Sequence, residues 1–125
     1  MTFDEAKSIL LLHSYSHPDT DHPTLVGGFL GSLRPYTGLN ETNFHAVMSA
    51  IIALAPYIQQ ASTIDKEVVS AVWAICGLSR AWGIRPDGML RRNNLIMDTD
   101  VTRLEQQGLR IIILGLQPHF GGKSW

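Results

Sequence analysis

The residues best suited to metal chemistry gather in one segment, HSYSHPDTDH, residues 13–22. His13 and His17 are four residues apart, which places both imidazoles on one helical face if the helix reaches His17. Asp19, Asp21 and His22 follow closely, and they would complete a nitrogen and oxygen site for zinc, manganese or iron. This cluster predicts a divalent-metal site, and with it a metal-dependent hydrolase as an alternative function.

The same segment also fits a polar loop, which is the interpretation that we favour. Pro18 and Pro23 bound its second half, and proline disfavours helical geometry in the residue before it, here His17. The chain lacks the His-Glu-x-x-His arrangement of zinc hydrolases, and Cys76 is its only cysteine, so no paired cysteine motif exists. We therefore expect no cofactor, with a divalent metal as the alternative.

A second group of residues would suit a small apolar or anionic ligand held between helices. Arginines are concentrated between residues 80 and 94, where Asp87 is the only acidic residue. Guanidinium groups bind phosphate or carboxylate, and large apolar side chains on facing helices can line a pocket. The candidate ligand site comprises Met48, Trp73, Trp82, Arg85 and Arg91. The more common alternatives are that the apolar members fill the core and that the arginines lie in a solvated turn.

Nucleophilic catalysis has no supporting pattern in this chain. No Gly-x-Ser-x-Gly turn occurs, and Ser70 and Ser79 fall inside a predicted helix. Cys76 lies in an apolar stretch, where a thiol normally behaves as an inert small hydrophobic group. We therefore lean against an enzymatic function.

The helix that must position several of these residues lies in the middle of the chain. Its centre, 68–78, reads VVSAVWAICGL and carries no charge. We predict a helix over roughly 64–83, capped by Ser62 or Thr63 and ended at Gly83. A helix that is apolar all round must be covered by several neighbours or by another chain. We expect the helices that contain Phe44 and Val101 to lie on either side of it.

The remaining pattern predicts an all-α fold, a compact antiparallel bundle of about five helices around this central one. A capping box at Thr2 and Glu5 starts a helix over 3–16, and Asn40 caps the helix that contains the apolar seam 44–58. Two further helices are expected over 24–33 and from residue 98 onward. Residues 109–114 also fit a buried strand, although no partner strand is evident. We expect one domain over 1–117 and an irregular tail over 118–125.

Composition argues against several classes of protein. The chain has 125 residues, 45% hydrophobic and 17% charged, which is typical of one globular domain. A net charge of −1 offers no general attraction to nucleic acid or to acidic membranes. No apolar stretch is long enough to span a bilayer, and no cationic leader precedes the first apolar run. We therefore expect a cytoplasmic protein that binds neither nucleic acid nor membrane.

The surplus of apolar helix surface predicts a small soluble interaction module. A domain of this size has limited means to cover both faces of the central helix, so we expect self-association, with a homodimer as the simplest form, or an unknown protein partner. The alanine-rich side of the second long helix, formed by Ala46, Ala50 and Ala53, would let another helix approach closely and is the candidate interface.

Overall fold

The structure, a computed structural model, describes residues 1–63 and 65–113. Over these residues the fold is all-α, with seven α-helices and one π-helical segment. They are α1 (Phe3–His13), α2 (Pro23–Gly27), α3 (Phe29–Leu33), α4 (Glu41–Gln60), α5 (Lys66–Leu78), η1 (Ser79–Ile84), α6 (Met89–Arg92) and α7 (Asp98–Ile113). The predicted tail over 118–125 and the domain boundary at 117 lie outside the described residues.

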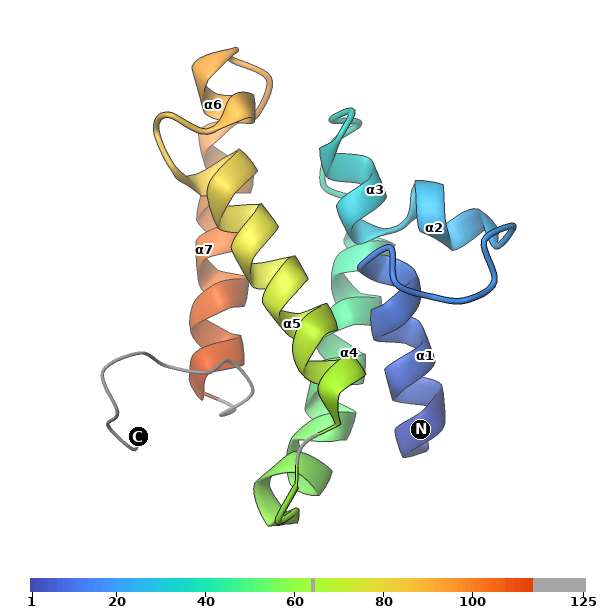
Figure 1. The fold of residues 1–125 in the computed structure, drawn as a ribbon. Coiled ribbons are helices and arrows are strands. Elements are labelled where there is room, and N and C mark those ends of the chain that lie inside the picture. The colour runs from blue at the N-terminus through green and yellow to red at the C-terminus, as the bar shows by residue number, and fades with distance from the viewer. Residues whose placement is uncertain (64, 114–125) are drawn as a thin grey trace.

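The four longer helices alternate in direction, as expected for an antiparallel bundle (Figure 1). Among them, α1 and α4 make the most extensive backbone contact. Outside its own continuation, α5 packs most closely against α1, whereas α7 makes its main contact with η1. Figure 1 shows α5 between α7 and the α1–α4 pair, but the expected packing of α5 directly between α4 and α7 is wrong, because α5 makes its main contacts with α1 and with its own continuation η1.

Capping residues fix most helix starts. The predicted capping box is present, with the Glu5 backbone N–H donating to Thr2 Oγ1 and the Thr2 N–H donating to Glu5 Oε1. Asn40 caps α4 as predicted, through the Asn43 N–H. The predicted cap of α5 is wrong: Asp65 takes that role, because its carboxylate accepts the N–H groups of Glu67 and Val68.

Three helix ends differ from prediction. The first helix stops at His13, so His17 is not helical. The helix expected over 24–33 is divided at Gly28, where the backbone is extended. The central helix changes from α-helical to π-helical geometry at Ser79 and ends at Ile84, one residue after the predicted end at Gly83.

One core joins these elements. Its largest fully buried members come from α1, α3, α4, α5, α6 and α7, and include Leu10, Phe29, Ile51, Ile75 and Leu104. Residues 109–113 are helical, so the alternative of a buried strand is wrong for them. Residue 114 lies outside the described residues. None of the helices within 1–63 and 65–113 has the length and apolar character needed to cross a bilayer.

Candidate functional site

His13 is a structural residue that joins α1 to α3. Its side chain is buried at the end of α1, and its Nδ1 accepts the backbone N–H of Phe29 over 2.9 Å. Phe29 is the first residue of α3, whose N-cap, Gly28, has no side chain to accept this donor. The imidazole therefore satisfies, from another helix, one of the backbone N–H groups that have no partner within α3.

The other two histidines of the candidate metal cluster also hold the loop together. His17 Nδ1 accepts the Asp19 N–H at 3.0 Å, and its Nε2 lies 3.1 Å from Ser8 Oγ. His22 caps α2 by accepting the Thr24 N–H at 3.2 Å. The carboxylate of Asp19 accepts the N–H of Asp21.

These hydrogen bonds explain the histidine-rich segment: its polar side chains hold a loop in its folded conformation. The rings of His17 and His22 have centroids 6.2 Å apart, but His13 faces the core. Within 1–63 and 65–113, no three or more His, Cys, Asp or Glu side chains are grouped so that they could hold a metal ion. The structure thus gives no support to the proposed use of His13, His17, Asp19, Asp21 and His22 as ligands.

The buried His13 predicts a pH-dependent stability. Burial lowers its pKa below the ordinary 6.5, so the unfolded chain binds a proton more readily than the folded one. The contribution of neutral His13 to the free energy of unfolding is fully present above pH 6.5. It is lost as the pH falls from 6.5, the pKa in the unfolded chain, through the lower pKa of the folded protein. Because only one proton is involved, the free energy of unfolding cannot change by more than about 1.4 kcal/mol per pH unit. Urea denaturation at a series of pH values between 5 and 8 would measure it.

The matched variant for this test is His13→Asn, whose side-chain oxygen can still accept the Phe29 N–H but does not titrate. We expect the variant to lose the slope between pH 5 and 6.5 and to keep any acid-induced loss at lower pH. Asp65 and Asp87, whose pKa values are lowered by hydrogen bonds from Lys7 and Arg85, contribute to that lower range. An unchanged slope would show that His13 is not its source.

The five residues of the predicted ligand site line neither of the two pockets that the structure describes. Met48 is buried in the core, and the guanidinium of Arg34 lies 5.6 Å from the ring centroid of the half-buried Trp82. Arg85 pairs with Asp87 at 3.1 Å, and Arg91 donates to the Ile84 carbonyl at 2.9 Å. These arginine contacts are those of a structured turn.

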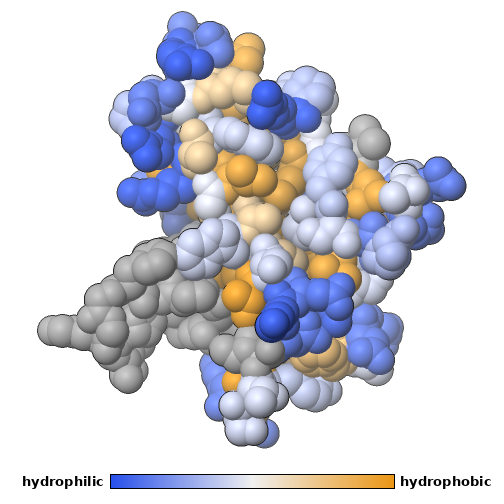
Figure 2. Space-filling view, viewed as in Figure 1, coloured by the Kyte–Doolittle hydropathy of each residue, from blue (hydrophilic) through white to orange (hydrophobic). Residues whose placement is uncertain are grey.

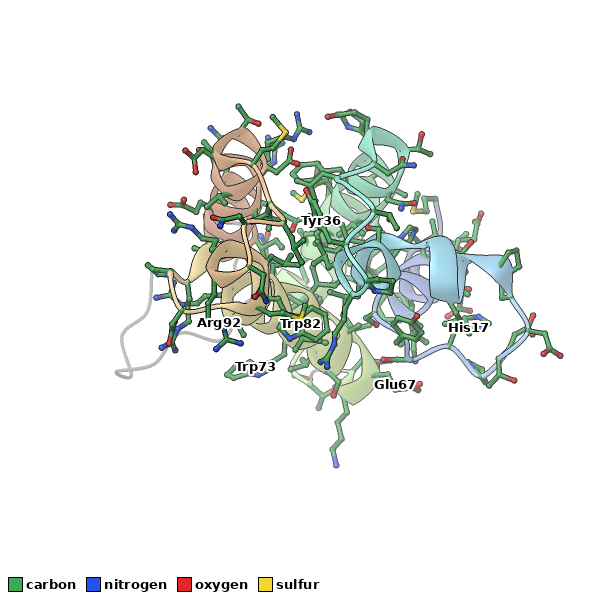
Figure 3. The ribbon with its side chains drawn as sticks, turned by 90° about the horizontal axis from the view of Figure 1, so that it is seen from above. His17, Tyr36, Glu67, Trp73, Trp82 and Arg92 are labelled. Carbon is green, nitrogen blue, oxygen red and sulfur yellow. The ribbon has the colours of Figure 1, made fainter. Side chains whose placement is uncertain are left out.

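Trp73 lies instead on the outer side of α5, at the edge of the bundle (Figure 3). Its side chain is 43% exposed, and Ser70 and Gly77 beside it on the helix are also exposed. Cys76 is half-buried, and burial raises the pKa of its thiol to about 11, so it remains a protonated thiol at neutral pH. That protonation state agrees with a structural role rather than a nucleophilic one.

The predicted alanine interface lies largely inside the molecule. Ala50 is fully buried in the core, and Ala46 and Ala53 are half-buried beside it. The small side chains had predicted a close helix approach, and α4 does pack closely, with α1 of the same chain. Ala50 therefore offers no free surface to a second molecule.

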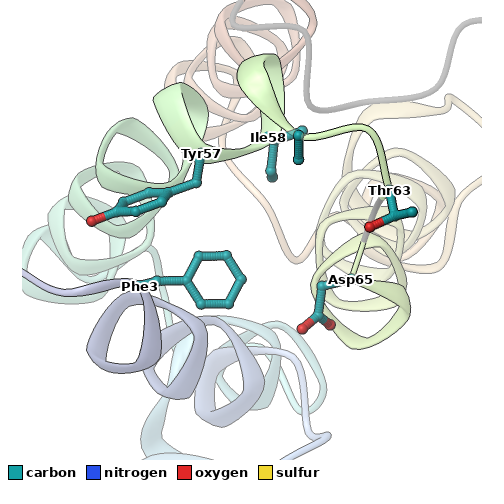
Figure 4. A pocket seen from close by; sticks show the side chains of 6 residues that line it. Phe3, Tyr57, Ile58, Thr63 and Asp65 are labelled. Atoms are coloured by element: carbon teal, nitrogen blue, oxygen red, sulfur yellow. The ribbon is translucent and has the colours of Figure 1, made fainter.

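Sequence reasoning did not identify the larger of two described pockets. It has a volume of about 420 Å³ and lies where α1 begins, α4 ends and the chain turns into α5 (Figures 1 and 4). Six residues line it: Phe3, Tyr57, Ile58, Ala61, Thr63 and Asp65. No motif could have revealed it, because its walls come from segments far apart in the chain. A smaller pocket lies between the end of α1 and the start of α5.

No protein-family model, curated protein or solved structure matches this chain.

Proposed function

We propose that this protein is an interaction module that self-associates through the outer face of α5, defined as Ser70, Trp73, Ala74 and Gly77. The carrying observation is that this exposed face has no charge. Every residue from Val68 to Ser79 is uncharged, although Ser70, Trp73 and Gly77 are exposed and Ala74 is half-buried. An exposed helix face normally carries charged or strongly polar residues, and apolar surface left in water is unfavourable.

The surface around α5 supports this choice. Figure 2 shows apolar side chains interspersed with weakly polar ones in the middle of the front face of the molecule, where Figure 1 places α5. On the outer face itself, Ser70, Ala74 and Gly77 are small residues at spacings of four and three. Small residues at this spacing let the backbones of two helices approach closely, with Trp73 beside them as a large apolar contact.

The charges that flank this face favour a second copy as the partner. Glu67 precedes the uncharged stretch and Arg80 follows it, and both are exposed; one carboxylate oxygen of Glu67 also pairs with Lys7 of its own chain, at 3.2 Å. In an antiparallel pairing of two α5 helices about a two-fold axis, Glu67 of one copy would lie opposite Arg80 of the other. The axis would pass between Trp73 and Ala74, at the centre of the uncharged face.

The test compares two glycines in helix interiors. A Cβ atom at Gly77 would meet only the Trp73 ring, at 4.0 Å, and one at Gly108 on α7 would meet nothing within 4 Å. Both Gly77→Glu and Gly108→Glu should therefore fold. We expect Gly77→Glu to raise the dimer dissociation constant at least about tenfold, which corresponds to 1.4 kcal/mol, whereas Gly108→Glu should leave it unchanged. Sedimentation equilibrium of the purified proteins would measure both constants.

Charge exchange provides a second arm of the same test. Arg80→Glu should weaken the dimer, because two glutamates would then lie opposite each other. Adding Glu67→Arg in the same chain should restore it, because opposite charges again face each other across the interface. A wild-type protein that sediments as a monomer at every concentration would overturn the proposal. A Gly77→Glu variant that dimerises like the wild type would exclude this face.

A further inference from the structure

The pocket at the lower end of the bundle has two chemically different sides. Figure 4 shows the ring of Phe3 and the side chain of Ile58 on one side, and the side chains of Thr63 and Asp65 on the other. Tyr57 stands beside Phe3 in edge-to-face contact, with centroids 5.5 Å apart and planes at 73°. A volume of about 420 Å³ falls within the range of small-molecule sites.

The aromatic side of the pocket favours a positive charge. The faces of phenyl and phenol rings carry negative electrostatic potential and attract ammonium groups within about 6 Å. Tyr57 is 50% exposed, so part of its ring is accessible from solvent. In Figure 4 the Tyr57 hydroxyl points away from the pocket, so the ring rather than the hydroxyl is the recognition element.

The carboxylate of Asp65 also favours a positively charged ligand. A hydrogen bond from Lys7 lowers its pKa, so the group is charged at neutral pH. It accepts Lys7 Nζ at 2.9 Å and the backbone N–H groups of Glu67 and Val68, while a carboxylate has about four lone-pair positions. One position therefore remains for a ligand donor. The Lys7 ammonium also bonds Glu67, so one positive charge faces two negative ones.

The end of α4 adds to this potential. The C-terminal end of a helix carries partial negative charge from carbonyl groups that have no partner within the helix. The last turn of α4 contains no basic residue to offset that charge. Aromatic faces, a carboxylate and the C-terminus of α4 thus surround one pocket that is open to solvent, and all three attract cations. The N-terminal ends of α1 and α5, which also lie at this pocket, carry partial positive charge, but acidic residues in the first turn of each helix offset it.

We propose that this pocket binds a small organic cation, an ammonium group carried on an apolar body. The apolar body would pack against Phe3, Tyr57 and Ile58, and the ammonium group would donate to Asp65. This site is separate from the outer face of α5, so its occupancy does not depend on self-association.

The test uses three probes of similar shape and different charge. Phenethylammonium, phenethyl alcohol and phenylacetate would each be titrated into the ¹⁵N-labelled full-length protein and followed by amide chemical shifts. We expect the cation to shift the amides of residues 57–65, the alcohol to bind about threefold to tenfold more weakly, and the anion not to bind. Equal binding of cation and alcohol, or shifts confined to other residues, would overturn the proposal.

Variants of the pocket separate ring, hydroxyl and charge. Tyr57→Phe should bind phenethylammonium like the wild type, whereas Tyr57→Leu should bind it about twofold to fivefold more weakly, because the aromatic face is lost. Asp65→Asn keeps a capping side chain at the start of α5 and should remove most of the preference for the cation over the alcohol. Gly77→Glu should bind normally, so that failure of this proposal and failure of the dimer proposal remain distinguishable. Unchanged affinity in Tyr57→Leu would overturn the assignment.

Discussion

Replacing Ala50 with glutamate is expected to unfold the protein. Ala50 is fully buried, with Val47, Ile51 and Leu54 of the same helix also in the core. A carboxylate at this position would have no partner, and burying an unpaired charge costs several kcal/mol, a large part of the 5–15 kcal/mol that stabilises a typical domain. We expect loss of the helical circular dichroism signal, or a fall in stability of about 4 kcal/mol or more in urea.

The matched control is Ser49→Glu, the same change one residue earlier. Ser49 is exposed on α4, so the charge stays in water and the stability should change by less than about 0.5 kcal/mol. If Ala50→Glu folded normally and only its assembly changed, Ala50 would lie on the surface, in contradiction to the packing of α4.

Replacing Gly28 with alanine is expected to be the second most damaging change. A Cβ atom there would collide with the carbonyl oxygen of Thr24 and would lie 3.1 Å from His13 Nδ1. The backbone oxygen cannot move without disturbing α2, and the imidazole is held by its bond to the Phe29 N–H. We expect a loss of about 1–3 kcal/mol, the usual range for overpacking, measured from the midpoint of urea unfolding.

Gly27 is the control for this change because it is adjacent and unhindered. Nothing lies within 4 Å of a Cβ placed at Gly27, which is the last residue of α2. Gly27→Ala should leave the stability unchanged or raise it by up to about 1 kcal/mol, because alanine favours the helix. Equal destabilisation by both substitutions would implicate backbone conformation rather than the collision at Gly28.

What could be predicted from sequence was local. The fold class and the caps at Thr2 and Asn40 followed from patterns within a few residues, and the structure confirms them. The start of α5 was harder, because Ser62, Thr63 and Asp65 are all good caps and the sequence does not rank them. The break at Gly28 depends on His13, which lies on another helix, so no local pattern reveals it.

The candidate sites depend even more on contacts between distant segments, which local sequence patterns do not reveal. A run of small apolar residues indicated that a helix would approach Ala50, but it did not say whether that helix belongs to the same chain. Histidines in the 13–22 segment suggested ligands, yet each one accepts a backbone N–H, which spacing alone could not show. The pocket beside Phe3 and Tyr57 exists only once α1 and α4 have packed together.

The π-helical segment η1 lets one continuous helix serve two different neighbours. Its turns take more residues than α-helical turns, as in the bond from the Arg85 N–H to the Arg80 carbonyl, so each side chain advances by less than 100°. Because of this smaller rotation, Ile75, Ser79 and Gly83, which are four residues apart, all lie on one buried side of the helix. At Gly83 the helix passes so close to α7 that a Cβ atom would lie only 2.7 Å from Leu104. The number of residues in this segment, and not only their chemistry, therefore sets how α7 joins the bundle.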